Sequence, residues 1–173
     1  MDRQAVRVEM EQARQRFHHL LDSATVAQLS QRSNGTKWTN GQLLFHMLFG
    51  YLVVVRLLFL VRIFGRLPDG FGRAFAGALE AAAGPFHVIN YVGSVVGPRL
   101  LGYPGMDRRF DLVVAKLLRR LDRESDAELA RGMRYPTSWD PYFKAYMTLA
   151  DVYRYPTQHF EHHCRQLTLI QPS

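Results

Sequence analysis

The chain has 173 residues, which is enough for one domain with one hydrophobic core and leaves little room for a second. Apolar residues make up 47% of the sequence, as in ordinary globular proteins. The net charge is +7, but the 19 Arg and 3 Lys residues are scattered along the sequence and form no single basic stripe. This dispersal argues against a nucleic-acid-binding protein, whereas an anionic small substrate or an acidic partner surface is compatible with it.

The single cysteine, Cys164, rules out a disulfide within the chain and a cysteine-rich zinc site. Any metal site must therefore be built from histidines and carboxylates. We expect Cys164 to be a small buried apolar residue rather than a nucleophile, because the sequence places no clear base for it. The N-terminal stretch "MDRQAVRVEMEQARQRF" is charged and lacks the apolar centre of a signal peptide, so the expected compartment is the cytoplasm.

The first two long helices are predicted from apolar periodicity and capping signals. Apolar residues recur at three- and four-residue spacing over residues 2–22, which predicts the first helix. The second is expected to begin at Thr39, because Gln42 follows three positions later and completes a capping box. It should run to about Phe64, before the helix-breaking residues Gly65 and Pro68.

The second helix is apolar enough to raise the question of a membrane span. Residues 38–55 carry no charge, but Arg56 and Arg62 interrupt the apolar stretch that follows. A central Arg costs roughly 2.5–3.5 kcal/mol on membrane-insertion scales. The preferred interpretation is a central bundle helix with no integral membrane span. A membrane-associated helix is the alternative, and the apolar excess is also compatible with a homodimer surface.

Residues 65–106 hold many of the glycines and several prolines, and we predict a long crossover there with one or two short helices. Asp107 is then expected to cap a third long helix, whose apolar stripe reaches Leu121. The spacing Ser125-x-x-Glu128 predicts a short extra helical turn, and "RYPTSWDPY" reads as a loop.

The last helix is predicted from Thr148, which forms a capping box with Asp151, to about Leu169. Pro156 falls inside it and should kink it by removing the backbone hydrogen bond to Val152. Alternatively, the helix begins later and Pro156 lies in its first turn. Four long helices with one extended connection predict an all-α four-helix bundle with a crossover between the second and third helices, as a single domain over residues 1–173.

The stretch "PTQHFEHHCRQL" holds three of the seven histidines. His159 and His163 are four residues apart, so they lie on one helix face and could present two imidazoles to one metal ion. His162 borders that face. A third ligand would have to come from another element, and His46 is the candidate because it lies in the most apolar stretch of the chain. A solvated histidine pair and a hydrogen-bonded core histidine remain the alternatives.

Two segments resemble the DinB-like family of metal-binding four-helix bundles. "WTNGQLLFH" is similar to the signature that opens that family's second helix, and "MTLADVYRYPTQHFEHHCRQL" resembles its last helix. The crossover between the second and third helices also matches, although residues 66–104 are longer and more apolar than expected. The resemblance implies one divalent metal, zinc or nickel, bound by His46, His159 and His163.

The resemblance also implies an activity. Characterised members are mostly transferases that use low-molecular-weight thiols such as mycothiol or bacillithiol, and some are isomerases or hydrolases. A metal-dependent thiol transfer to an electrophilic small molecule is therefore expected. A non-catalytic binding or interaction module is the alternative. The candidate helper residues lie close to the histidines in the sequence, with a loop that could form the rim of the pocket: Tyr153, Arg154, Tyr155 and His162, then Trp139, Asp140 and Tyr142.

Overall fold

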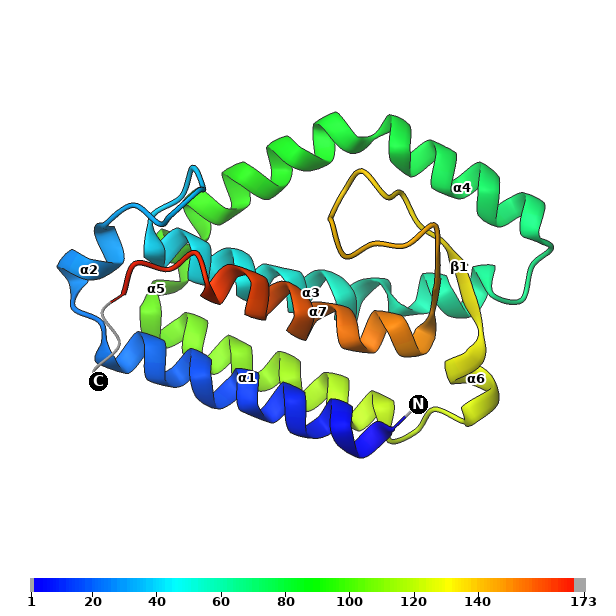
Figure 1. Ribbon diagram of the computed structural model, residues 1–173, viewed down its shortest axis with the longest axis horizontal. Helices are drawn as coiled ribbons and strands as arrows, with labels where there is room; N and C mark the ends of the chain where they lie inside the picture. Colours follow the sequence, from blue (N-terminus) through cyan, green and yellow to red (C-terminus); the bar gives the residue numbers. More distant parts are fainter. Residues whose placement is uncertain (1, 170–173) are drawn as a thin grey trace.

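Four long helices pack together in the computed structural model, which describes residues 2–169 (Figure 1). They are α1 (Arg3–Ser23), α3 (Asn40–Phe64), the second half of α5 (Ala83–Leu121) and α7 (Leu149–Cys164). Helix α3 contacts both α5 and α7, and α1 contacts the same two helices. The all-α bundle predicted from the sequence is confirmed.

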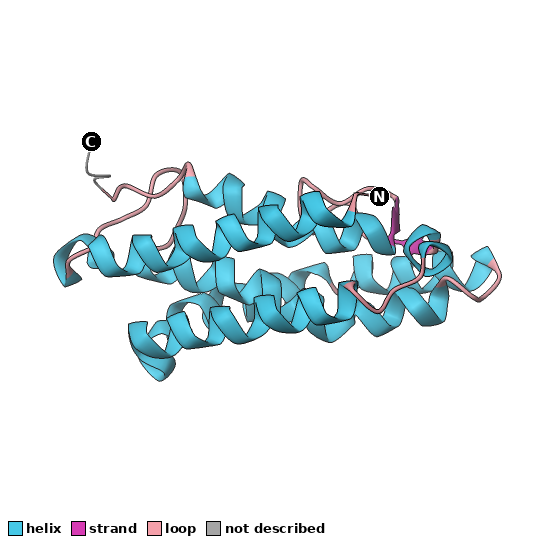
Figure 2. Cartoon of the chain, turned by 90° about the horizontal axis from the view of Figure 1, so that it is seen from below, coloured by secondary structure: helices cyan, strands magenta, loops and turns pink. Residues whose placement is uncertain are grey.

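Shorter elements connect these helices. They are α2 (Val26–Ser30), α4 (Asp69–Ala81), α6 (Asp126–Ala130), β1 (Gly132–Arg134) and β2 (Tyr146–Thr148). The two strands pair antiparallel, with Met133 opposite Met147, and bring the segment after α6 back to the start of α7. Figure 2 shows how small this strand pair is beside the helices.

Side chains cap the helices largely where the sequence predicted it. Thr39 caps α3, Ser125 caps α6 and Thr148 caps α7, each in a complete capping box. A fourth capping box, at Thr25, begins α2, which the sequence analysis had treated as part of a connection. The predicted cap at Asp107 is wrong, because this residue lies inside α5 and forms an ion pair with His18 of α1.

The bundle core is built around a cluster of aromatic side chains. Phe17 of α1 stacks on Phe110 of α5 with ring centroids 4.2 Å apart, and Tyr51 and Phe160 pack against the same ring. All four side chains are fully buried. Burying each contributes about 1.5–3 kcal/mol relative to exposure, so this cluster is a main source of bundle stability.

Helix α3 is the one helix in residues 2–169 that is long and apolar enough to cross a bilayer. Its most apolar window has a mean hydropathy of 2.2, and 61% of that window is buried inside the molecule. This burial accounts for its apolar character, since the helix is in contact with α5, α7 and β1. The interpretation as a central bundle helix explains the sequence without a membrane.

The crossover is much more helical than predicted. Helix α4 and the first half of α5, up to Leu101, form an arch beside α3 (Figure 1). The long helix α5 is interrupted at Gly102, whose φ of 65° and ψ of 163° are accessible to few residues other than glycine. Pro104 follows in the first turn of the second half, where its missing N–H is tolerated. Hereafter, residues 69–101 are called the roof.

Helix α7 ends at Cys164, five residues before the predicted end. The segment beyond it is held by Asn40, whose side-chain amide donates to the Thr168 hydroxyl and accepts from the Thr168 backbone N–H. Pro156 lies in the interior of α7, so the alternative start at this proline is wrong. The predicted loop over residues 134–142 is correct except that Arg134 belongs to β1.

Candidate metal centre

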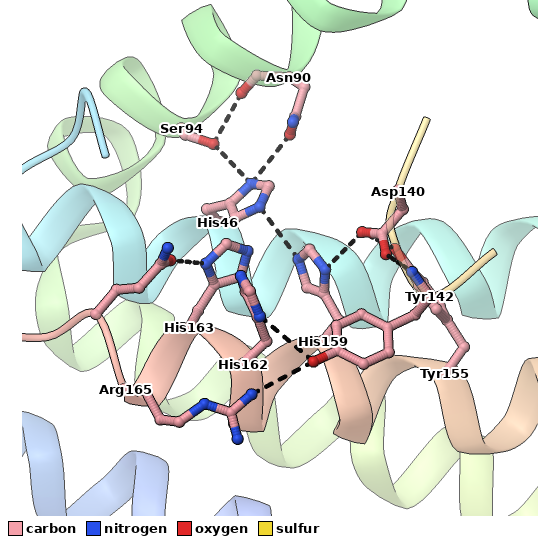
Figure 3. A network of polar contacts seen from close by, with 11 residues as sticks. His46, Asn90, Ser94, Asp140, Tyr142, Tyr155, His159, His162, His163 and Arg165 are labelled. Carbon is pink, nitrogen blue, oxygen red and sulfur yellow. Dashed lines mark hydrogen bonds and ion pairs between the residues drawn. The ribbon is translucent and has the colours of Figure 1, made fainter. Parts of the chain in front are cut away.

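Three histidines from two helices lie close together beneath the roof residues Asn90 and Ser94 (Figure 3). His46 lies on α3, and His159 and His163 lie one turn apart on α7. The Nε2 atoms of His46 and His159 are 3.1 Å apart, and one ring nitrogen of each histidine lies within 4.8 Å of the others. The residues are buried, with 6%, 5% and 8% of their surface exposed. The structure therefore brings together the three histidines that the sequence analysis proposed as metal ligands.

A glycine makes this close approach possible. Gly50 lies one turn after His46 on α3, directly opposite the ring of His159. A Cβ atom at position 50 would lie 3.1 Å from the His159 Cδ2 atom and 3.6 Å from its Nε2 atom. Glycine at this position thus allows the α7 imidazole to lie against the α3 backbone.

Each of the three histidines has a separate partner for its Nδ1 atom. Nδ1 of His46 lies 3.1 Å from the side-chain oxygen of Asn90, on the roof. Nδ1 of His159 lies 2.9 Å from the carboxylate of Asp140, in the loop between the strands. Nδ1 of His163 lies 2.6 Å from the side-chain oxygen of Gln166, just beyond α7.

These contacts determine the tautomer of each ring. An oxygen acceptor at Nδ1 requires a proton on Nδ1, which leaves the lone pair on Nε2. The Nε2 atoms of His46 and His159 then face one another at 3.1 Å as two acceptors, an arrangement that is unfavourable unless a cation lies nearby. A proton could serve, or a metal ion.

The environment disfavours the proton. Burial is the main cause that lowers the pKa of His46 well below its usual value, and the neighbouring His159 and His163 lower it further. The pKa of His163 is lowered to about 3, mainly by burial and further by the neighbouring His159 and His162. Neutral imidazoles with converging lone pairs are the state that binds a metal ion.

Asp140 supplies a negative charge behind His159. Burial alone would raise the pKa of its carboxyl, but hydrogen bonds from His159, the Tyr142 backbone N–H and the Tyr155 hydroxyl outweigh this and lower it. The carboxylate is therefore ionised at neutral pH. A carboxylate bonded to the distal nitrogen of a ligating histidine orients the ring and makes it a better donor.

The donor set fits a divalent ion of zinc or nickel type. Imidazole nitrogen is a preferred ligand of both, and two nitrogens bound to one tetrahedral zinc would lie about 3.4 Å apart, close to the observed separation. Three protein ligands leave coordination positions open, which is typical of catalytic rather than structural sites.

A cavity of about 430 Å³ adjoins the cluster. Its walls come from α3 and the residue Trp38 just before it, the roof, the strands β1 and β2 with the loop between them, and α7. Aromatic and aliphatic side chains make up most of the lining: Trp38, Phe49, Val53, Val54, Leu57, Leu60, Phe75, Leu79, Phe86, Met133, Tyr135, Trp139, Phe143, Met147 and Val152. Small-molecule sites generally combine an apolar wall of this kind with a few polar groups at one place.

The proposed helper residues fall into two groups. Tyr155 and His162 line the cavity. The Tyr155 hydroxyl donates to Asp140, and the Nδ1 atom of His162 lies 3.3 Å from the Tyr142 hydroxyl. Arg154 does not belong to the cavity lining, so the structure does not bring it to the histidines.

Two further candidates lie away from the cavity. Tyr153 is buried in the bundle, where its hydroxyl donates to Glu124. Cys164 is buried too, and burial raises its thiol pKa to about 12, which makes it a poor nucleophile at neutral pH. The three suggested rim residues, Trp139, Asp140 and Tyr142, all line the cavity.

Sequence reasoning missed the Nδ1 partners of His46 and His163, and it named Asp140, the Nδ1 partner of His159, only as a residue at the rim of the pocket. Asn90 and Ser94 lie on the roof, 44 and 48 residues from His46 in the sequence, and no local signal connects them to it. Gln166 could have been found, because it follows His163 by three residues and therefore lies near it at the end of α7.

Comparison with known proteins agrees with this arrangement. The sequence profile of the DinB superfamily matches residues 9–167, which is nearly the whole chain. No curated protein and no solved structure matches the chain significantly. Because the profile match covers most of α1, the other three bundle helices and the three histidines, the chain belongs to the DinB superfamily.

Proposed function

We propose that the chain binds one divalent metal ion, zinc or nickel, through His46, His159 and His163. The observation that carries this proposal is the convergence of three buried imidazoles whose Nδ1 atoms are all bonded to side-chain oxygens. With Nδ1 occupied, the Nε2 atoms are left to bind an ion at a point between the rings, where one nitrogen of each histidine lies within 4.8 Å of the others. Protons are poor occupants of that point because burial and mutual repulsion lower the pKa values of His46 and His163.

We further propose that the site transfers a low-molecular-weight thiol, such as mycothiol or bacillithiol, to an electrophilic small molecule. A bound divalent ion would lower the pKa of a thiol or of water, so that the nucleophile exists at neutral pH. In the transfer, the thiolate sulfur forms a bond to the electrophilic atom, and the leaving group departs with the bonding electron pair. The thiol proton goes to a base.

The side chains of the site have distinct roles in this proposal. Asp140 keeps His159 in the Nδ1–H tautomer, and Tyr155 positions Asp140. His162 is the candidate base, because its ring borders both the cluster and the cavity. The apolar walls exclude water from the electrophile, which limits hydrolysis as a competing reaction.

The presence of a cavity supports a binding site over an interaction module whose pocket is closed. Residues 66–104 cover the site, but they contribute walls to the cavity and leave its interior open. The same metal centre could also activate water, so a hydrolase or isomerase activity remains the second candidate for assay.

The first experiment is elemental analysis of protein purified without a His-tag or added metal. We expect about one zinc or nickel ion per chain. His46→Ala, His159→Ala and His163→Ala should each lose the metal. His19→Ala is the matched control, because His19 is exposed on α1 and belongs neither to the histidine cluster nor to the cavity lining.

Thiol transfer is tested next on the metal-loaded protein, with mycothiol or bacillithiol and a set of electrophiles. Full metal occupancy in all three cluster variants would contradict the site. Metal binding without turnover of any thiol would leave the metal centre intact and remove the transferase assignment.

A further inference from the structure

We propose that the cavity binds an extended, uncharged apolar molecule, one end of which lies at the three histidines. This inference rests on the proposed function for the chemistry at that end. It concerns the part of the ligand that lies away from the reacting atoms, and so defines the substrate class.

The first argument is the shape of the cavity. Its lining on α3 runs from His46 through Val53 to Leu60. Leu60 follows His46 by 14 positions, which is about 21 Å along a helix. The cavity is therefore long in one direction, with the histidine cluster at one end. At the other end lies Phe75, whose ring stacks on Phe64 at a centroid distance of 4.3 Å.

The second argument is the chemistry of the walls. Among the described residues, the lining contains no Lys or Arg and a single carboxylate, Asp140. That carboxylate already accepts hydrogen bonds from His159, Tyr155 and the Tyr142 backbone. A charged group placed in the long part of the cavity would lose its hydration without gaining a partner, which is costly.

The composition of the walls restricts the class of ligand more than the net charge of the chain does. An anionic substrate is compatible with a net charge of +7, yet the basic residues do not line the cavity. Burial of apolar surface is the interaction that the cavity offers over most of its length, worth about a fourfold gain in affinity for each buried methylene.

The third argument is that contacts at two places hold the roof in position, so the cavity exists without a ligand. The Trp139 indole N–H donates to the Leu79 carbonyl at 3.1 Å, and the Trp139 ring stacks on Phe86 at 4.0 Å. Near the start of the roof, Arg134 of β1 forms a bidentate ion pair with the Asp69 carboxylate, at 2.9 and 3.0 Å. A preformed apolar cavity binds its ligand without the cost of ordering the walls.

The test uses two fluorescent probes with closely similar rings. N-phenyl-1-naphthylamine is uncharged, and 1-anilinonaphthalene-8-sulfonate carries a sulfonate. We expect the uncharged probe to bind with one site per chain and at least about tenfold more tightly than the sulfonate. Straight-chain alcohols should displace it, with affinity rising about fourfold per methylene until the cavity is filled.

Two matched variants locate the site. Val53→Phe places bulk halfway along the cavity and should weaken probe binding about tenfold or more, while Val88→Phe changes an exposed residue on the outside of the roof and should leave it within about twofold. Circular dichroism and the Tm confirm that both variants fold. Equal probe affinity in the two variants, equal binding of both probes, or displacement that does not depend on chain length would each overturn the proposal.

The experiment separates this inference from the metal proposal. The probe and alcohol titrations are made on protein stripped with a chelator, so they do not depend on a metal. Alkyl hydroxamates, which chelate metals, are then compared with alcohols of equal chain length on metal-loaded protein. If affinity rises with chain length but hydroxamates bind no more tightly than alcohols, the apolar cavity is supported and the metal site is contradicted. If hydroxamates bind more tightly but affinity does not rise with chain length, the metal site is supported and the apolar cavity is contradicted.

Discussion

Asp140→Asn is the substitution that most directly tests how the protein prepares its histidines. Oδ2 of Asp140 accepts from both the His159 Nδ1–H and the Tyr155 hydroxyl, while Oδ1 accepts from the Tyr142 backbone N–H. An asparagine has one oxygen and one NH₂ group, and so cannot accept at both positions. Placed with its oxygen toward Tyr142, it turns an N–H toward His159. The reverse orientation sets two donors against each other at Tyr142.

The first orientation forces His159 into the wrong tautomer. With a donor at Nδ1, the ring must carry its proton on Nε2, the atom that points to His46. Loss of a partner of this kind weakens metal binding about 10- to 100-fold. The corresponding free energy is about 1.4–2.7 kcal/mol. Tyr155→Phe removes only one donor to the carboxylate, so its effect should be smaller.

The assay is a competition titration of zinc against a chromophoric chelator at pH 7.5, with the Tm of each metal-free variant as a folding control. Asp22→Asn is the matched substitution, because Asp22 is exposed near the end of α1. A dissociation constant for Asp140→Asn within about twofold of the wild type, while His159→Ala abolishes binding, would refute the reasoning about the tautomer.

Three further outcomes follow from the structure. Gly50→Ala should weaken metal binding, because its Cβ would lie 3.1 Å from the His159 ring and displace it. The same crowding should hold any gain in unfolding free energy below the roughly 1 kcal/mol that the helix propensity of alanine supplies; zinc titration and urea denaturation measure the two effects. Trp139→Phe keeps the ring but loses the indole hydrogen bond to the roof, and should lower the urea-unfolding free energy by about 0.5–1.5 kcal/mol. Burial lowers the pKa of His18, but the carboxylates of Asp111 and Asp107 outweigh burial, so the pKa is raised in the folded state. The protonated His18 therefore stabilises the fold below the unfolded pKa of about 6.5, and this stabilisation is lost as the pH rises through the folded pKa. The stability difference between the wild type and His18→Gln should therefore be larger at pH 6 than at pH 9, and an equal difference would contradict the ion pair.

The sequence predicted the bundle helices and the His159–His163 pair because both depend on local spacing, whereas His46 was identified from its place in an apolar helix and from the family resemblance. His159 and His163 share a face through helical periodicity, and the capping boxes at Thr39 and Thr148 set the start of the helices that carry all three histidines. Local rules of this kind survive packing, since the helices bury their apolar faces without changing their own geometry.

The roof could not be predicted in the same way. Its glycines and prolines disfavour a helix by intrinsic propensity, but packing against α3 and β1 outweighs that preference. Asn90 becomes a partner of His46 only because this helix exists and crosses the cluster. Such a pairing depends on tertiary structure and leaves no short-range trace in the sequence. The end of α7 was missed for a similar reason, because Asn40 holds residues beyond Cys164 in another conformation.

The break at Gly102 separates two parts of α5 that have different roles. Residues before it shape the space that a ligand would occupy, while residues after it belong to the bundle core, with Phe110 at its centre. Substitutions at Phe86 of α5, or at Phe75 and Leu79 of α4, would therefore reshape the cavity, because none of these residues contacts the three imidazoles through a hydrogen bond. A laboratory that wished to retarget this protein could randomise the cavity-lining positions before the glycine, keep Asn90 and Ser94 as the partners of His46, and leave the residues after the glycine fixed.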